Sequence, residues 1–133
     1  MSPTPPSSRR MEWSTLEELP SSSLGRLRPL KGSEKALLAR LSAQLGDAAP
    51  WVDRLDSLRV QDMPDDGMGS LYFASDTKVL EGRKFGRRVA ELQFDDADGV
   101  VILASLNVDT VGELYELDIW RTDFKPVIRL NPP

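Results

Sequence analysis

The stretch VVILASLNVDTVGELYELDIWR, Val100 to Arg121, decides the fold. It holds two short segments, 100–107 and 113–121, that are rich in leucine, β-branched and aromatic residues and flank a short loop. Segments of this kind, bounded by Asn, Asp and Gly, predict two antiparallel strands joined by a hairpin loop. The first segment is apolar on both faces, which is typical of a strand in the middle of a sheet.

Strand patterns continue on the N-terminal side of this stretch. Segments 69–75 and 88–95 are short and rich in apolar residues, and a further strand is expected around 58–62. The turn DDADG contains Asp98-Gly99, which suits the left-handed backbone of a tight turn. The last three strands are therefore expected to form an antiparallel meander in a sheet of about five strands.

The clearest helix is SEKALLARLSAQLG, Ser33 to Gly46. Ser33 is a good N-cap residue, the leucines follow a helical spacing, and Gly46 lies where a C-terminal glycine is common. Pro50 then opens a short second helix or turn that leads into the strand around 58–62. One leucine-rich face has to be buried, so we predict an α+β fold in which this N-terminal helix packs on the sheet.

The chain divides into a flexible N-terminal segment, 1–25, and one α+β domain, 26–133. The first part holds four of the ten prolines, together with serine clusters and no hydrophobic period. Between the strands 69–75 and 88–95 lies DTKVLEGRKFGRR, which is basic. This segment is expected to be a solvated loop, with a phosphate or acidic-partner site as the alternative.

The amino acids that are missing exclude several classes of chemistry. The 133 residues include no cysteine and no histidine. Disulfides, thiolate metal sites, cysteine nucleophiles and histidine general bases are therefore excluded. No apolar run is long enough to cross a bilayer and no signal-peptide core is visible, so a cytoplasmic location without membrane contact is expected.

Charge is distributed unevenly along the chain. Residues 1–31 hold five basic and three acidic residues, a net +2, whereas the remainder holds 12 basic and 18 acidic residues, a net −6. An acidic domain repels phosphate backbones, which counts against nucleic-acid binding, and it attracts basic proteins.

Acidic residues in the last predicted strand invite a functional interpretation. Alternation predicts that Tyr115, Leu117 and Ile119 share one face and that the other face carries Leu114, Glu116, Asp118 and Trp120. Glu116 and Asp118 could form a catalytic carboxylate pair, a metal site, cross-strand pairs with Arg88 or another basic residue, or a protein-binding face. The turn DMPDDGMGS contributes Asp65 and Asp66, which are expected to bond backbone amides, and neither it nor DDADG has the EF-hand spacing.

Several motifs also carry a family resemblance. The segments RPL (28–30), DGMGSL (66–71), DADGV and ASLNVDTVGELYELDIWRTDFKP resemble a family of small bacterial α+β proteins of unknown function, with ELDIWRTDF as the most distinctive part. Such families look like the immunity proteins that accompany antibacterial toxins. The resemblance implies a class of protein and no catalytic residue.

Together these observations predict an immunity-type protein that neutralises a cognate toxin by occluding its active site. The toxin is expected to be basic at its active site. For this protein itself, no enzyme activity, cofactor, bound metal or nucleic-acid partner is expected. The predicted partner-binding residues are Asp65, Asp66, Glu116, Asp118, Trp120 and Asp123. A small hydrolase that uses Glu116 and Asp118, and a structural or regulatory subunit that dimerises through its sheet edge, are the alternatives.

Overall fold

The structure is a computed structural model that describes residues 26–75 and 81–132. The predicted flexible segment 1–25, and the part of the basic loop that includes Lys78, lie outside the described residues. In chain order the elements are β1 (Arg28–Pro29), α2 (Gly32–Ser42), the 3-10 helices η2 (Ala43–Ala48) and η3 (Pro50–Ser57), β2 (Arg59–Asp62), β3 (Leu71–Phe73), β4 (Phe85–Asp95), β5 (Val101–Asp109) and β6 (Leu114–Arg121).

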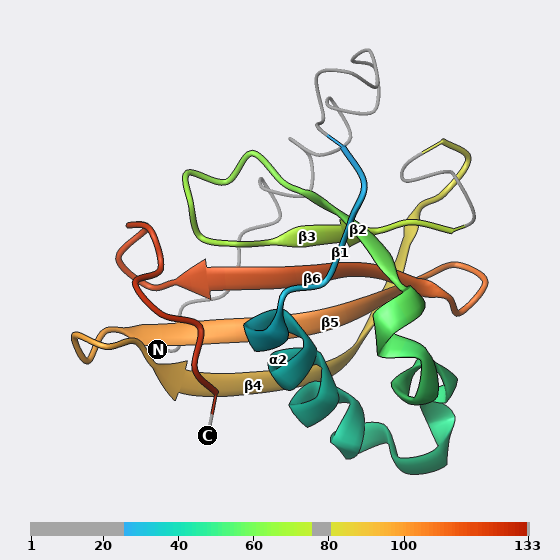
Figure 1. Cartoon of the computed structure of the whole chain (residues 1–133), viewed down its shortest axis with the longest axis horizontal. Coiled ribbons are helices and arrows are strands. Elements are labelled where there is room, and N and C mark those ends of the chain that lie inside the picture. The colour runs from blue at the N-terminus through green and yellow to red at the C-terminus, as the bar shows by residue number, and fades with distance from the viewer. Residues whose placement is uncertain (1–25, 76–80, 133) are drawn as a thin grey trace.

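The strands form one antiparallel sheet in the order β1-β2-β3-β6-β5-β4 (Figure 1). The predicted meander of β4, β5 and β6 is confirmed, as is the hairpin turn, in which Gly99 has a φ of 86°. The sheet has six strands rather than about five. The additional one, β1, is only two residues long and pairs with β2 through Arg28 and Val60.

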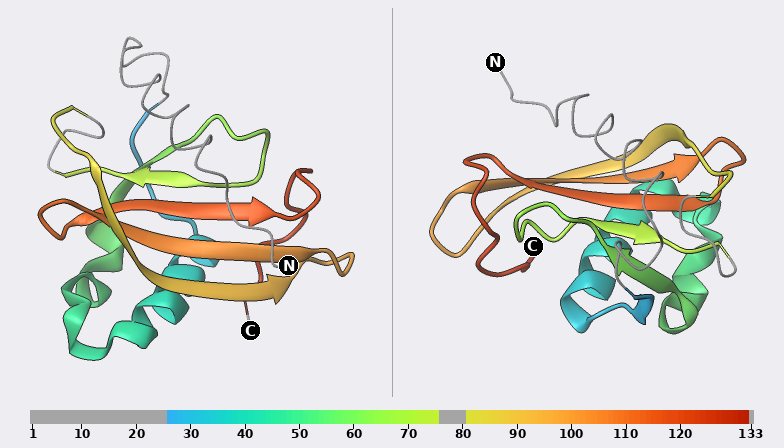
Figure 2. Two further views of the ribbon diagram at one scale, coloured as in Figure 1. Left: turned by 180° about the vertical axis from the view of Figure 1, so that it is seen from behind. Right: turned by 90° about the horizontal axis from the view of Figure 1, so that it is seen from above.

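The helices α2, η2 and η3 lie together on one side of the sheet, as the views from behind and above show (Figure 2). Leu37, Leu38 and Leu41 of α2 are completely buried against Ile102 and Leu106 of β5 and other members of the same core. The predicted α+β class and the burial of the leucine face are therefore confirmed. Among the described residues, no helix has the length and apolar character needed to cross a bilayer.

The helix begins earlier than predicted, because Ser33 is not its N-cap. Lys31 holds that position, and its backbone N–H donates to the Glu34 carboxylate over 2.7 Å. Arg28 binds the same carboxylate at 2.8 Å and also binds Asp62 at 2.7 Å. The start of α2 is thus fixed by its own first turn and by Arg28, which joins that turn to Asp62 of β2, and the serine hydroxyl is not needed as a cap.

The end of this helix also differs from the prediction. The α-helical hydrogen bonding stops at Ser42, and the chain continues as η2, within which Gly46 has a φ of 56°. The buried indole of Trp51 in η3 donates to the Ser42 hydroxyl at 2.8 Å. This hydrogen bond holds η3 beside the end of α2. The α-helix therefore ends at the residue that contacts η3.

Strand β4 starts at Phe85, three residues before the predicted position. The register with β5 shifts twice, between Phe85 and Arg87 and again between Arg88 and Ala90. Such bulges interrupt the alternation that identifies a strand in the sequence. The predicted loop is correspondingly shorter, and its Arg83 is buried and paired with Asp109 at 3.1 Å rather than solvated.

A bulge also changes the predicted faces of β6. Leu114 pairs with Val108, and Glu116 pairs with Asn107, so Tyr115 is the extra residue. Leu114 consequently joins Leu117 and Ile119 in the core under α2, which corrects its assignment to the other face. The Tyr115 ring instead lies 6.3 Å from the ring of Tyr72.

Candidate functional site

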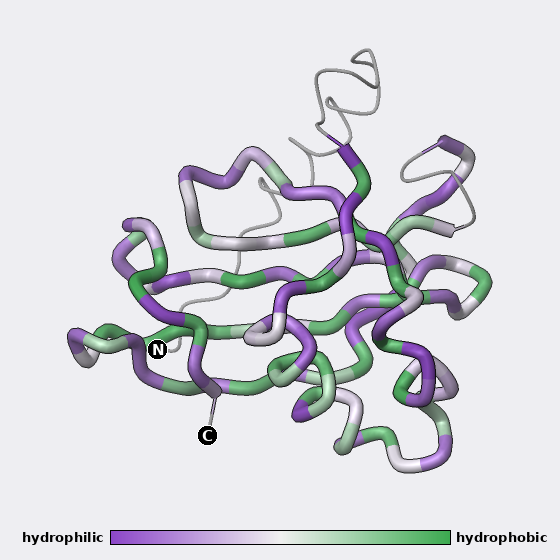
Figure 3. The backbone as a smooth tube through the Cα atoms, viewed as in Figure 1, coloured by the Kyte–Doolittle hydropathy of each residue, from purple (hydrophilic) through white to green (hydrophobic). Residues whose placement is uncertain are grey.

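Three segments meet at the end of the sheet where β4 and β6 finish. They are the loop 63–70, the hairpin 96–100 and the C-terminal segment 122–131, and we call them together the acidic end. The three segments appear on the left of Figure 1. Figure 3, in the same view, shows hydrophilic residues in each of them. The acidic end contains two basic residues, Lys125 and Arg129, against five aspartates, namely Asp65, Asp66, Asp96, Asp98 and Asp123.

Arg121, the last residue of β6, is the centre of this region. Its side chain is buried and forms ion pairs with Asp96 at 2.7 Å, Asp98 at 2.6 Å and Asp123 at 2.8 Å. Five hydrogen bonds to these carboxylates use all five guanidinium N–H donors. One positive charge thus holds three negative charges in a fixed arrangement, which leaves a net negative group.

Asp96 joins the C-terminal segment to the hairpin. Its carboxylate accepts hydrogen bonds from the backbone N–H groups of Ile128 at 2.7 Å and Arg129 at 2.9 Å. On the other side, Val127 donates its N–H to the Gly67 carbonyl at 3.2 Å. The C-terminal segment is therefore tied to the hairpin and to the loop 63–70.

These contacts keep the carboxylates charged. Burial raises the pKa of Asp96, but hydrogen bonds from the backbone N–H groups of Ile128, Arg129 and Ala97 and from Arg121 outweigh it and lower the pKa to about 2. Hydrogen bonding to Arg121 lowers the pKa of Asp123 to about 2 as well, and it lowers the pKa of Asp98. The acidic end thus keeps its negative charge at neutral pH.

A pH dependence of stability follows from these values. Asp96 and Asp123 have a pKa of about 2 in the folded chain, against an ordinary 3.8, so the unfolded chain binds more protons as the pH falls. We expect the urea midpoint to be constant near neutral pH and to fall between about pH 5 and pH 2. Asp96→Asn should be less stable at pH 7 and should show a shallower decline, whereas an unchanged decline would contradict this assignment.

Asp65 organises the loop 63–70 from within. Its carboxylate accepts the N–H groups of Gly69 at 3.3 Å and Ser70 at 2.8 Å, as predicted for an aspartate in a turn. The Ser70 hydroxyl accepts the Ile119 N–H at 2.8 Å and lies 3.3 Å from a carboxylate oxygen of Asp118. Asp65 and Asp118 are therefore linked through one buried serine at the junction of β3 and β6.

Glu116 lies two residues further into the sheet than Asp118. It is buried and accepts a hydrogen bond from the Asn107 amide at 2.9 Å. Arg88, which was considered as one possible basic partner of Glu116, forms its ion pair with Glu91 at 3.0 Å instead. Glu116 therefore belongs to the buried polar side of the sheet rather than to the acidic end.

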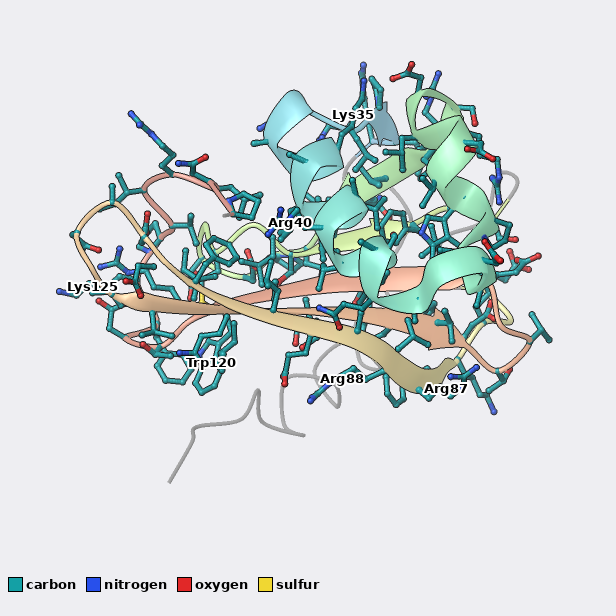
Figure 4. All side chains as sticks on the ribbon, turned by 90° about the horizontal axis from the view of Figure 1, so that it is seen from below. Lys35, Arg40, Arg87, Arg88, Trp120 and Lys125 are labelled. Atoms are coloured by element: carbon teal, nitrogen blue, oxygen red, sulfur yellow. The ribbon has the colours of Figure 1, made fainter. Side chains whose placement is uncertain are left out.

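Trp120 forms the apolar part of the site. It is 3 % exposed and packs with Met68, Leu103 and Val101 in a small cluster separate from the main core. The ring of Phe124 lies 5.4 Å from the Trp120 ring, and Phe124 as a whole residue is 56 % exposed. Figure 4 places Trp120 and Lys125 at the same end of the molecule, with Arg87 towards the other end.

The structure thus brings together most of the predicted partner-binding residues. Asp66 and Asp123 are exposed at the acidic end, Asp65 is a buried member of the same end, and Trp120 is buried next to it near the end of β6. Asp118 is buried beside Ser70, and Glu116 lies apart from the others. The exposed pair Asp66 and Asp123 therefore offers the most accessible charge of the six.

Sequence reasoning did not single out Arg121, Asp96 or Phe124. The predicted hairpin turn DDADG, which contains Asp96, is confirmed, but the bonds of Asp96 to residues 128 and 129 bridge more than 30 positions and leave no local pattern. Phe124 has a φ of 65°, unusual for a residue other than glycine. The sequence signal that marks Phe124 is its position between two charged residues, Asp123 and Lys125, shortly after the predicted strand 113–121.

A hollow of about 540 Å³ lies at the opposite end of the sheet. Trp51 and Phe73 contribute apolar walls, and Arg54 and Glu113 are its charged residues. Glu116 and Asp118, the carboxylates of the alternative hydrolase, do not line it. Within residues 26–75 and 81–132, no group of three or more acidic side chains is arranged to hold a metal ion.

Comparison with known proteins gives a family and no individual relative. No curated protein and no solved structure matches the chain. One family description, a domain of unknown function (DUF6984), matches residues 27–131, which include every described strand and helix. The chain therefore belongs to the DUF6984 family.

Proposed function

We propose that this protein is an immunity-type protein that binds a basic toxin through the acidic end and occludes the toxin's active site. The observation that supports this most directly is the fixed negative charge around Arg121, where three aspartates surround one guanidinium. The toxin as partner rests on the resemblance of ELDIWRTDF and its neighbouring motifs to proteins that look like immunity proteins.

The arrangement suits rapid recognition of a basic surface. Charges that are held in place before contact cost less conformational entropy on binding than charges on free side chains. Complementary fields also raise the association rate, and this effect declines with added salt. Asp66, Asp98 and Asp123 are exposed and can act in this way, and Asp98 and Asp123 are already ordered by Arg121.

The first test is co-expression with the product of each flanking gene, in a catalytically inactive form if that product is toxic. The expected result is a stoichiometric complex that survives gel filtration and restores growth when the active toxin is produced. Absence of a complex with either product would overturn the proposed function.

The charge argument has its own test in association kinetics. Asp66→Asn removes an exposed charge at a residue with a φ of 59°, a conformation that asparagine tolerates. We expect its association rate at low salt to fall about three- to fivefold, with a smaller difference at high salt. Asp47→Asn, on η2 and also exposed, is the matched control and should leave the rate unchanged. Equal rates for both variants would contradict docking through the acidic end.

A further inference from the structure

Phe124 combines exposure with an unfavourable backbone conformation. Its φ of 65° lies in the left-handed region, which is costly for a residue with a Cβ atom and is found mainly in glycine, asparagine and aspartate. Strained residues of this kind persist only where the surrounding structure holds them in place, and they cluster at functional sites. The side chain is also more than half exposed, so burial does not account for its presence.

The turn itself has no need of an aromatic residue. The Phe124 N–H donates to the Arg121 carbonyl at 2.9 Å, and the Lys125 N–H donates to the Asp123 carboxylate at 3.0 Å. These bonds involve the backbone of residue 124 and the side chain of residue 123, so glycine at 124 would keep them with less strain. The phenyl ring must therefore contribute something other than the turn.

The ring is held firmly although it is exposed. It packs on Trp120 at 5.4 Å with an angle of 56° between the ring planes, and Trp120 is itself fixed by Met68 and Leu103. Asp123, next to it, is bound to Arg121 through both carboxylate oxygens. A rigid aromatic side chain loses little entropy when it is buried by a partner, which is why such residues dominate binding energy at interfaces.

The surroundings define what the ring fits. The exposed acids Asp66, Asp98 and Asp123 lie in the three segments of the acidic end, and Ile128, which is 60 % exposed, adds a second apolar side chain. An apolar centre within a polar rim is the usual organisation of a protein interface. The three exposed acids outnumber the two exposed basic residues of this end, Lys125 and Arg129, so the complementary surface is an apolar pocket with a mainly basic rim.

We propose that Phe124 is the anchor residue of the acidic end, and that it inserts into an apolar pocket with a basic rim on the partner protein. This inference rests on the proposed function and adds a single residue whose loss weakens binding measurably. The described chain offers a matched comparison, because Val111, in the turn between β5 and β6 at the opposite end of β6, is 78 % exposed and also apolar.

The experiment uses the full chain and the inactive form of the flanking-gene product that binds it. Titration calorimetry is performed on the wild type, Phe124→Gly, Phe124→Asn and Val111→Gly, and thermal unfolding is followed for each. We expect Phe124→Gly and Phe124→Asn to bind about thirtyfold more weakly, equal to about 2 kcal/mol, while Val111→Gly binds as the wild type does. Both Phe124 variants should melt within a few degrees of the wild type, because relief of the left-handed strain offsets the lost contact with Trp120.

The possible outcomes separate the two proposals. If the wild type forms no complex, the proposed function fails and this inference fails with it. If the wild type binds and both Phe124 variants bind within threefold of it, only the anchor assignment is overturned. A fall in melting temperature for both Phe124 variants as large as that of a core substitution such as Leu38→Ala would also overturn it, because the ring would then be structural.

Discussion

Replacing Arg121 by methionine is expected to lower the melting temperature by about 10 °C or more, because the substitution leaves Asp96 buried without its cation. The Asp96 side chain is 0 % exposed and lies 2.7 Å from the guanidinium. Removing one partner of a buried ion pair is much more costly than removing an exposed pair, since the remaining charge stays away from water. Methionine preserves most of the apolar stem of the arginine side chain. The fall in melting temperature therefore reflects the missing charge rather than a cavity.

Arg88→Met is the matched control for this substitution. Arg88 belongs to the same sheet, but both members of its ion pair with Glu91 are more than 40 % exposed. We expect its melting temperature to change by no more than about 3 °C. Differential scanning calorimetry on both variants provides the measurement, and similar melting temperatures for the two would show that Arg121 does not organise the acidic end.

A double variant tests whether the effect comes from the pair. In Asp96→Asn/Arg121→Met no fully buried carboxylate is left without its cation, because the remaining partners of Arg121, Asp98 and Asp123, are partly exposed to water. We expect the loss of stability to be clearly smaller than the sum of the two single losses. Additive losses would mean that the two residues act independently.

The substitution Gly86→Ala should destabilise the chain by about 3 kcal/mol, through a clash rather than through backbone torsion. A Cβ atom at Gly86 would lie 2.2 Å from the carbonyl oxygen of Asp109 and 2.5 Å from its carbonyl carbon. Both atoms belong to the backbone of β5, so the strand itself would have to move. The position lies between Phe85 and Arg87, where the register of β4 and β5 shifts.

Gly32→Ala is the control for this second substitution. No atom lies within 4 Å of a Cβ built at Gly32, which is the first residue of α2. Alanine favours helix formation over glycine, so stability should be unchanged or should rise by up to about 1 kcal/mol. Urea unfolding of both variants is the measurement, and a Gly86→Ala variant as stable as the wild type would contradict the close approach of β4 to Asp109.

The elements that were predicted correctly depend on short-range patterns. Leu37, Leu38 and Leu41 are close enough in sequence to define a helical face, and that face is buried in the core. Asp98 and Gly99 suit a tight turn, and the hairpin between β4 and β5 forms there. Local patterns are reliable in these cases because the residues that form each pattern lie within a few positions of one another in the sequence.

The predictions that were wrong concern places where distant residues interfere. Ser33 is a good cap by composition, yet the N-cap is Lys31, and Arg28 joins Glu34 in the first turn to the distant Asp62 of β2. The bulge at Tyr115 shifts Leu114 to the core face, because it arises from pairing with Asn107 and Val108 on another strand. Bulges and long-range ion pairs produce no periodic pattern of residues, so they cannot be inferred from the sequence.

By itself, the sequence determined the α+β class, the meander of the last three strands, the helix that covers them and the acidic balance of the chain. These follow from hydrophobic period, turn residues and composition, which are properties of neighbouring residues. Only the tertiary structure decided that Asp98 and Asp123 pair with Arg121, and that Phe124 and the loop of Asp66 lie at the same end of the sheet. The reason is that antiparallel pairing of the strands brings the segments 63–70, 96–100 and 122–131 to the same end of the sheet. That pairing depends on contacts between residues far apart in the chain.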